Sequence, residues 1–306
     1  MRLDGIHHVT AITADAQRNV DFYAGTLGLR LVKTTVNFDA PDMYHLYFGD
    51  RTGSPGSILT FFEIPGAAPG AAGPGMIHRV VLRVPDEPAL DEWERRLRMA
   101  GRPVERDETS LVTTDPEGLA LELRASGRGE TPLTAPAIPD VAVTGIDGVR
   151  MYSLRPERTL AAATEVLGFQ AEYPDVLVVR GARRSGRLWL DTPPPGARRA
   201  PGAGTVHHVA WTATDDDHER WRDRVRDGGL QGTDVVDRQY FRSVYFREPG
   251  GVLFEIATVG PGFTADEPED TLGEALKLPP VYEPHRDEIA RRLRPFERPP
   301  VAGAPR

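Results

Sequence analysis

The tetrapeptide Ile6-His7-His8-Val9 near the start of the chain recurs 200 residues later as Val206-His207-His208-Val209. Two further apolar segments of the same kind begin at Ile77 and at Ile146. Their β-branched residues favour extended backbone, so each segment is predicted to begin a β-strand. A strand start that recurs indicates an internal repeat. These four starts divide the chain into four repeated units, named modules 1 to 4 in chain order.

Each strand start is followed by a stretch with the spacing of an amphipathic helix, and three of these stretches are rich in charged residues. In the first stretch, Val20, Tyr23, Ala24 and Leu27 recur at steps of three and four residues, which places them on one helix face. The predicted helices span residues 14–29, 88–101, 155–169 and 215–229.

Each module then closes with short β-like runs. The last runs span residues 57–64, 119–124, 186–192 and 252–258. Each module is therefore predicted to be β-α-β-β-β, and the fold class is α+β. One such module cannot bury its sheet alone, so modules must pair. We expect an N-terminal domain at 1–127, a C-terminal domain at 143–258 and a tail at 259–306, with the proline-rich segment 132–139 as a connector.

Composition excludes several classes of function. The chain has 306 residues, 40% of them hydrophobic, and a net charge of −8, so a nucleic-acid backbone or an anionic membrane surface is not an expected partner. It has no cysteine, which excludes disulfides, thiolate metal sites and thiol nucleophiles. The first ten residues lack the pattern of a secretory signal, and no apolar run approaches the roughly 18 residues that span a bilayer. A cytoplasmic location is the expectation.

Paired β-α-β-β-β modules resemble the vicinal-oxygen-chelate superfamily, which includes glyoxalase I, fosfomycin-resistance proteins and extradiol dioxygenases. Four modules favour the dioxygenase branch. Six segments in order are similar to the ring-cleaving dioxygenases that act on hydroquinones: 5–13, 19–41, 45–62, 206–211, 237–258 and 260–267. The resemblance implies cup-shaped sheets, metal ligands on the first and last strands of the modules, and a small aromatic substrate with O2.

An alignment of the modules locates candidate ligands. The first-strand position holds His8, Arg79, Gly148 and His208, and the last-strand position holds Glu63, Glu122, Trp189 and Glu255. Gly148 offers no ligand, so a metal site between modules 3 and 4 is excluded. We infer that modules 1 and 4 share one cup and that modules 2 and 3 form a cup without metal. His8, His208 and Glu255 then form the two-histidine, one-carboxylate set of Fe(II) oxygenases, which Mn(II) also fits.

Glu63 leaves an alternative open. As a fourth ligand it would make the site resemble that of a glyoxalase-like isomerase or lyase. A role beside the ligands or facing solvent is preferred, because a one-residue slip in register reverses the direction of the side chain. A third reading is a non-catalytic small-molecule-binding protein, but such proteins usually lack the three ligands.

Five further residues are candidates for catalysis: His7, Thr10, His207, Arg238 and Tyr245. Strand alternation points His7 and His207 away from the cup unless a bulge or twist intervenes. The resemblance implies active-site roles for both and for the pair Arg238 and Tyr245. Arg242 competes with Arg238 for its role. His45, on a strand of module 1, is a candidate to line the cup, with packing as the preferred role. We expect His218 and His285 to be solvated helix residues. A homo-oligomer is compatible with the sequence.

Overall fold

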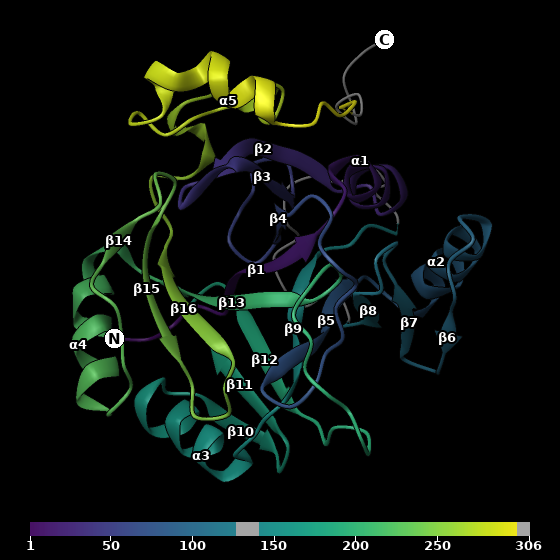
Figure 1. Cartoon of the computed structure of the whole chain (residues 1–306). Coiled ribbons are helices and arrows are strands. Elements are labelled where there is room, and N and C mark those ends of the chain that lie inside the picture. Colours follow the sequence, from purple (N-terminus) through teal and green to yellow (C-terminus); the bar gives the residue numbers. More distant parts are fainter. Residues whose placement is uncertain (127–140, 299–306) are drawn as a thin grey trace.

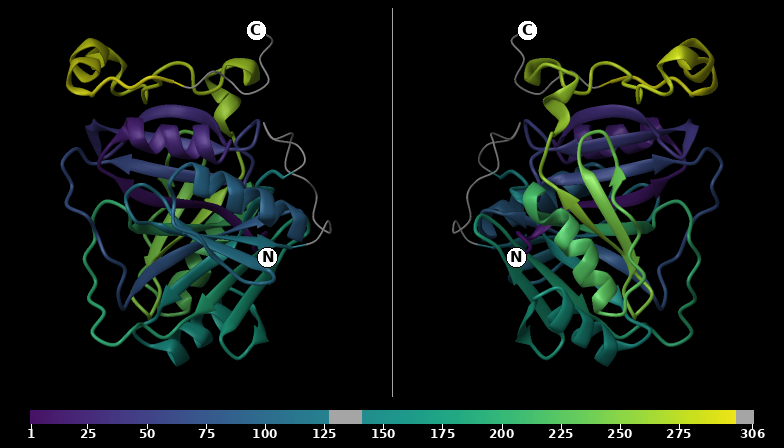
Figure 2. Two further views of the ribbon diagram at one scale, coloured as in Figure 1. Left: turned by 90° about the vertical axis from the view of Figure 1, so that its right-hand side faces the viewer. Right: turned by 90° about the vertical axis from the view of Figure 1, so that its left-hand side faces the viewer.

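The computed structural model describes residues 1–126 and 141–298, and all four predicted modules are present in them (Figure 1). Two eight-stranded curled sheets form the centre, and the helices lie along their outer sides (Figures 1 and 2). The predicted α+β class is therefore confirmed. The helices are α1 (Ala16–Val20), α2 (Glu87–Met99), α3 (Pro156–Ala161), α4 (His218–Asp227) and α5 (Arg286–Arg292), and α1 and α3 continue as π-helical turns at Asp21–Thr26 and Ala162–Val166.

The first sheet combines modules 1 and 4, in the strand order β14-β15-β16-β13-β1-β4-β3-β2. Its central pair is β1 against β13, which run antiparallel and carry the two His-His segments. The strands of module 1 are β1 (Ile6–Thr13), β2 (Arg30–Asn37), β3 (Ala40–Gly49) and β4 (Ile58–Glu63). Those of module 4 are β13 (Val206–Ala213), β14 (Val236–Asp237), β15 (Arg242–Arg247) and β16 (Leu253–Thr258).

The second sheet combines modules 2 and 3, in the order β10-β11-β12-β9-β5-β8-β7-β6. The strands of module 2 are β5 (Met76–Val84), β6 (Glu105–Arg106), β7 (Ser110–Thr114) and β8 (Ala120–Ala125). Those of module 3 are β9 (Gly145–Tyr152), β10 (Gln170–Tyr173), β11 (Val176–Arg180) and β12 (Ser185–Leu190). The inferred pairing of module 1 with module 4 is what the structure has.

Chain halves and sheets do not coincide. Each of the ranges 1–127 and 143–258 contributes one module to each sheet, so a sheet is built from both halves of the chain. The boundaries of the two ranges remain a prediction, and the connector at 132–139 lies outside the described residues.

A β-bulge lies at the same place in all four first strands. Across β1 and β13, Ile6 pairs with Trp211 and His8 with Ala210, so His7 has no partner. Farther along this ladder the extra residue is His207. The pair β5 and β9 has the same two irregularities, at His78 and Asp147. A bulge leaves one residue unpaired and re-aims its side chain, so strand alternation does not apply at these positions.

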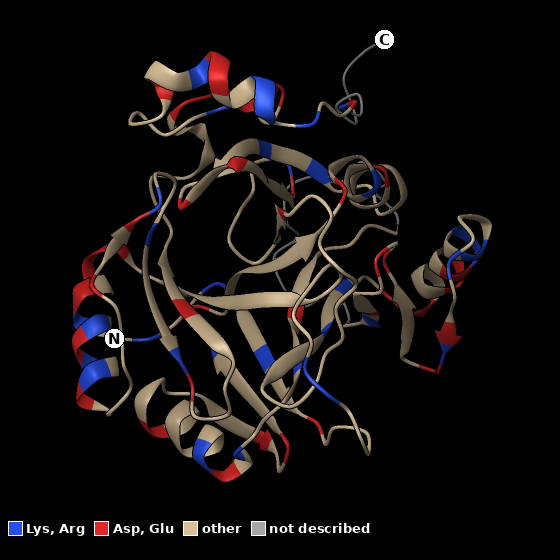
Figure 3. Cartoon of the chain, in the orientation of Figure 1, with Lys and Arg blue, Asp and Glu red and all other residues tan. Residues whose placement is uncertain are grey.

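Most charged side chains of the helices face outward. Helices α2, α4 and α5 carry acidic and basic residues together rather than a face of one sign (Figure 3). On its inner side α2 buries Leu90, Trp93 and Leu97 against the second sheet. None of the helices in the described ranges has the length and apolar content that a bilayer crossing needs.

The segment that follows β16 crosses the outer edge of the first sheet, above β2 and β3 (Figures 1 and 2). A short bridge joins Leu276 to Thr34 of β2, and the Lys33 ammonium, which is fully buried, contacts Asp266 and Glu267. This segment, residues 259–298, is called the clasp below. It covers β2, which would otherwise be an open edge strand.

Candidate metal centre

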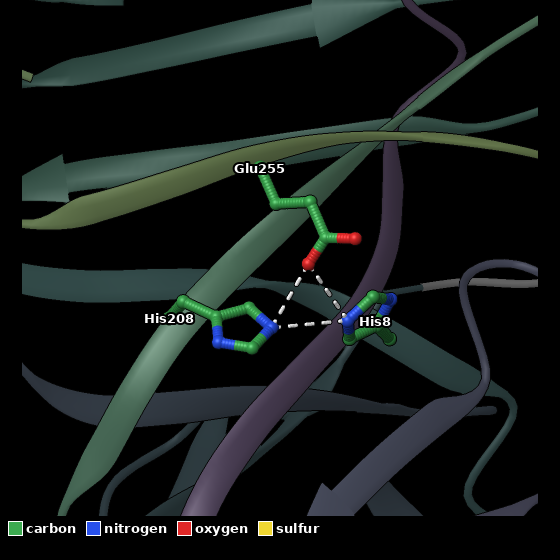
Figure 4. Close-up of side chains that lie close together, drawn as sticks. All are labelled: His8, His208 and Glu255. Atoms are coloured by element: carbon green, nitrogen blue, oxygen red, sulfur yellow. Dashed lines mark hydrogen bonds and ion pairs between the residues drawn. The ribbon is translucent and has the colours of Figure 1, made fainter. Parts of the chain in front are cut away.

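His8, His208 and Glu255 converge from β1, β13 and β16 onto one point (Figure 4). His8 Nε2 lies 3.2 Å from His208 Nε2 and 3.3 Å from Glu255 Oε2, and the remaining distance, from His208 Nε2 to Glu255 Oε2, is 2.9 Å. Within the described residues, this is the one group of three or more His, Asp or Glu side chains whose donor atoms lie that close together. All three side chains are buried.

The size of this triangle tests whether a metal fits. Around an ion with bonds of about 2.1 Å, neighbouring ligand atoms lie about 3.0 Å apart in an octahedron and about 3.4 Å apart in a tetrahedron. The three distances of 2.9–3.3 Å therefore suit three adjacent ligands on one octahedral face. Glu255 Oε2 is moreover buried, and it contacts the Nε2 atoms of His8 and His208, the other two candidate ligands. A cation seated on the triangle would bind all three atoms.

Protonation of the site also suits a cation. Burial alone would raise the pKa of Glu255, but the neighbouring imidazoles of His8 and His208 lower it well below its usual value. Burial lowers the pKa of His208, and Glu255 only partly opposes this. An anionic carboxylate and a neutral imidazole are the forms that bind metals. Ser243 Oγ donates to the other carboxylate oxygen, Oε1, and so orients Glu255.

The bulges bring His7 and His207 back beside the ligands. His7 Nδ1 lies 2.9 Å from His8 Nδ1, and His207 Nδ1 lies 2.7 Å from His208 Nδ1. In both doublets the second nitrogen of the ligand residue is therefore hydrogen-bonded while its Nε2 faces the triangle. Such a contact fixes the tautomer and the ring orientation of a ligating histidine. His7 is buried, whereas His207 is exposed to the cavity described next.

A cavity of about 320 Å³ opens beside the triangle. It is lined by His8, Ile12, Asn37, Phe38, Asp39, Met43, His45, Tyr47, Phe62, Ile64, His207, His208, Arg238, Phe241, Tyr245 and Leu253. Most of the exposed wall is apolar, and a smaller polar part includes the candidate ligands His8 and His208, as in pockets for small molecules.

Arg238 and Tyr245 lie together on the cavity wall. Arg238 Nε donates to the Tyr245 hydroxyl over 3.1 Å, and Arg238 Nη1 forms an ion pair with Asp39 at 3.2 Å. Burial and the charge of Glu255 raise the pKa of Tyr245, so its hydroxyl keeps its proton. The competing Arg242 points elsewhere and donates to the Asp215 carbonyl. The structure thus brings Arg238, and not Arg242, to the cavity.

Glu63 takes no part in the triangle. It is buried rather than solvent-facing, and its Oε1 accepts a hydrogen bond of 3.1 Å from the Ala16 amide at the start of α1. The module alignment was three residues off here. Glu255 stands opposite Ala210 on the first strand of its module, and the residue in the same relation in module 1 is Thr60, opposite Thr10. Thr10 is buried, and its hydroxyl accepts a hydrogen bond from Thr60.

Basic side chains fill the corresponding place in the second sheet. Glu122, which matches Glu255 in position, accepts hydrogen bonds from Arg79 Nη1 at 3.1 Å and Arg150 Nε at 2.7 Å. His78 contacts Asp191 at 2.9 Å.

Comparison with known proteins identifies the family of this chain. The sequence profile of the Glyoxalase/Bleomycin resistance protein/Dioxygenase superfamily matches residues 5–123 and 145–256. The chain belongs to this superfamily. Among curated relatives, the "Putative ring-cleaving dioxygenase MhqO" of Bacillus subtilis is 44% identical, with 96% of each chain covered. The "Chlorohydroquinone/hydroquinone 1,2-dioxygenase" of Sphingobium indicum is 33% identical, with 95% of this chain and 96% of the relative covered.

The fold also matches solved structures. A crystal structure titled as a "putative dioxygenase" from Bacillus subtilis matches with a TM-score of 0.88 at 44% identity, covering 97% of this chain and 98% of that one. Glyoxalase I from Zea mays matches with a TM-score of 0.60 at 14% identity, covering 83% and 92%. The second likeness concerns the fold alone. The predicted resemblance to the superfamily and to its ring-cleaving dioxygenases is thus confirmed.

Proposed function

We propose that this chain is an Fe(II)-dependent dioxygenase that cleaves the ring of a hydroquinone-type diphenol. The observation that carries the proposal is the triangle of His8, His208 and Glu255, with edges that suit one octahedral face, at the wall of a mostly apolar cavity. Two relatives support it, one named as a putative ring-cleaving dioxygenase and one as a chlorohydroquinone/hydroquinone 1,2-dioxygenase, which match 96% and 95% of this chain. Mn(II) would fit the same ligands.

Iron held by these three residues would keep open positions for a phenolate oxygen and O2 and would pass electrons between them. The protein itself supplies the surroundings. Phe62, Phe241 and Leu253 offer apolar surface to an aromatic ring and displace water. Arg238 provides a fixed positive charge for an anion that develops on the substrate. Tyr245 keeps its proton and can donate it to an oxygen in the cavity.

Three further side chains hold neighbouring groups in position: His7, His207 and Thr10. His7 and His207 hold the ligand imidazoles with Nε2 toward the triangle. Because His207 also reaches the cavity, it is the one of the two that can contact a substrate. Thr10 lies on the same strand as His8 and belongs to a chain of hydroxyls that includes Thr60.

The glyoxalase-like alternative calls for a fourth protein ligand. The place related to Glu255 by the module repeat holds Thr60, whose hydroxyl is already used between Thr10 and His45. Glu63 faces α1. Three ligands with open positions favour oxygen chemistry over a closed four-ligand site. A purely binding function gives no reason for two imidazole nitrogens and a carboxylate oxygen to be buried within 3.3 Å of one another.

The test is anaerobic reconstitution with Fe(II), followed by O2 uptake with hydroquinone, methylhydroquinone and catechol. We expect stoichiometric iron and uptake with at least one of the para-diphenols. Replacing Glu255→Gln removes the anionic ligand, so iron should be lost and activity should fall at least about a hundredfold.

Glu122→Gln is the matched control, since Glu122 has the same place in the second sheet and is paired with arginines. It should retain iron. A protein that holds one iron and consumes no O2 with any diphenol would falsify the proposed reaction. Unchanged iron content in Glu255→Gln would refute the ligand set.

A further inference from the structure

The module repeat relates the two sides of the cavity residue by residue. On β15, Tyr245 stands opposite Glu255, and on β3, Tyr47 stands opposite Thr60. Two positions farther along the last strand of each module, Ser243 stands opposite Ala257, and His45 opposite Phe62. The module 1 side of the cavity therefore has a polar cluster of its own, called the module 1 corner. There Thr60, His45 and Tyr47 replace Glu255, Ser243 and Tyr245.

These replacements form one hydrogen-bonded chain. Tyr47 Oη lies 2.8 Å from His45 Nδ1, His45 Nε2 lies 2.7 Å from Thr60 Oγ1, and Thr60 Oγ1 donates to Thr10 Oγ1 over 3.0 Å. His45, whose preferred role was packing, is thus a polar group of the cavity wall. Its ring also packs on Tyr47 with centroids 4.0 Å apart, so both side chains are held in place.

Counting protons fixes the direction of the chain. Thr60 has one hydroxyl proton and gives it to Thr10, so its oxygen must accept from His45 Nε2–H. Burial lowers the pKa of His45 well below its usual value, so the ring is neutral and Nδ1 carries no proton. The Tyr47 hydroxyl therefore donates to Nδ1. No described residue donates in turn to the Tyr47 oxygen, which is left as a hydrogen-bond acceptor beside the cavity.

From this we infer that Tyr47, held by His45 and Thr60, accepts a hydrogen bond from the ring hydroxyl of the substrate that is not on the metal. The module 1 corner would then make the site bind diphenols more tightly than monophenols. A ring with a methyl group in place of this hydroxyl would leave the Tyr47 acceptor buried against an apolar group, which disfavours binding. The inference rests on the proposed function and names the feature by which that site recognises its substrate.

The experiment measures binding without turnover. Dissociation constants of hydroquinone and 4-methylphenol, two rings of nearly equal size, are determined by calorimetry on the Fe(II)-loaded protein under nitrogen. We expect the wild type to bind hydroquinone about tenfold more tightly than 4-methylphenol. In Tyr47→Phe this preference should disappear through weaker binding of hydroquinone, with 4-methylphenol little affected.

Two further variants complete the design. Thr60→Val removes the acceptor for His45 Nε2 without touching Tyr47 and should also reduce the preference, which keeps the test available if Tyr47→Phe does not fold. Tyr44→Phe removes a hydroxyl from the same strand on its other side, where Tyr44 packs against Phe296, and should leave the preference unchanged.

Equal affinity of the wild type for the two ligands, or a full preference in both Tyr47→Phe and Thr60→Val, overturns the inference. Either result leaves the proposed function standing as long as the wild type consumes O2 with a diphenol. Absence of O2 uptake with every diphenol would instead count against the proposed function.

Discussion

At the scale of single residues, the two histidines of each His-His doublet have different roles. The second histidine of each doublet turns Nε2 toward the triangle, and the first holds the other nitrogen of that ring. Both doublets have the same interplanar arrangement, with ring centroids 5.1 Å apart. The same contact built twice, from strands of different modules, indicates that the first histidines serve the orientation of the ligands.

His7 is the cleaner of the two for a test, because it is buried and does not line the cavity. His7→Ala removes the hydrogen bond that fixes the His8 ring, so metal affinity should fall about 10- to 100-fold. Titration against a competing chelator measures it. His78→Ala, at the equivalent bulge of the second sheet, should leave the affinity unchanged. An affinity equal to wild type in His7→Ala would mean that the doublet does not orient the ligand.

At the scale of elements, the sequence was sufficient to predict the modules and the pairing of module 1 with module 4. The reason is that the repeated segments, together with Gly148, leave few alternatives for the ligand-bearing strands. The register of β4 was not predictable. In Ile58–Glu63 all residues but Phe62 are buried, so no alternation of polar and apolar residues marks the two faces. Glu63 was consequently placed where Thr60 lies.

Helix and loop contacts also escaped prediction. His218 was expected in solvent, but it is buried at the start of α4 and its Nε2 donates to the Ile256 carbonyl. For His45, packing was the preferred role. Residues two apart on a strand share a face, so its position two residues before Tyr47 could have indicated the hydrogen bond between the two side chains. Hydrogen bonds between elements distant in sequence depend on register and packing, which single-strand patterns do not contain.

The contact of Glu63 with α1 leads to a prediction at this scale. The carboxylate accepts a hydrogen bond from the Ala16 amide, one of the N–H groups at the helix start that have no partner within the helix. The positive end of the helix dipole also stabilises its negative charge. Glu63→Ala should lower the free energy of unfolding by about 1 kcal/mol, measured by urea denaturation. Its iron content should equal that of the wild type. Loss of iron in a folded Glu63→Ala protein would revive the four-ligand site.

At the scale of the whole molecule, the candidate metal centre lies where the two ends of the repeat meet. His8 belongs to the first strand of the chain and Glu255 to the last, so the triangle forms only when β1 and β13 are paired. The clasp then returns from β16 to module 1. Tyr282 donates to the Phe38 carbonyl, and Phe263 packs on Tyr47 with centroids 5.1 Å apart. The clasp thus contacts two residues that line the cavity, Phe38 and Tyr47.

Lys33 joins β2 to the clasp through a buried ion pair. Its buried ammonium lies between Asp266, at 2.6 Å, and Glu267, and it also donates to the Phe263 carbonyl. Lys33→Met keeps the apolar stem but leaves Glu267, only 5% exposed, without its counterion. An uncompensated buried charge is costly, so the free energy of unfolding should fall by about 3 kcal/mol.

Guanidinium denaturation measures this loss, and Lys277→Met is the matched control. Lys277 lies in the same clasp and contacts β2 through its backbone amide, so its substitution should change stability by less than about 0.5 kcal/mol. A loss below about 1 kcal/mol in Lys33→Met would show that the clasp is held by its backbone bridge and apolar contacts rather than by this ion pair. The full loss would make one buried lysine the main link between the clasp and the sheet that carries the candidate metal centre.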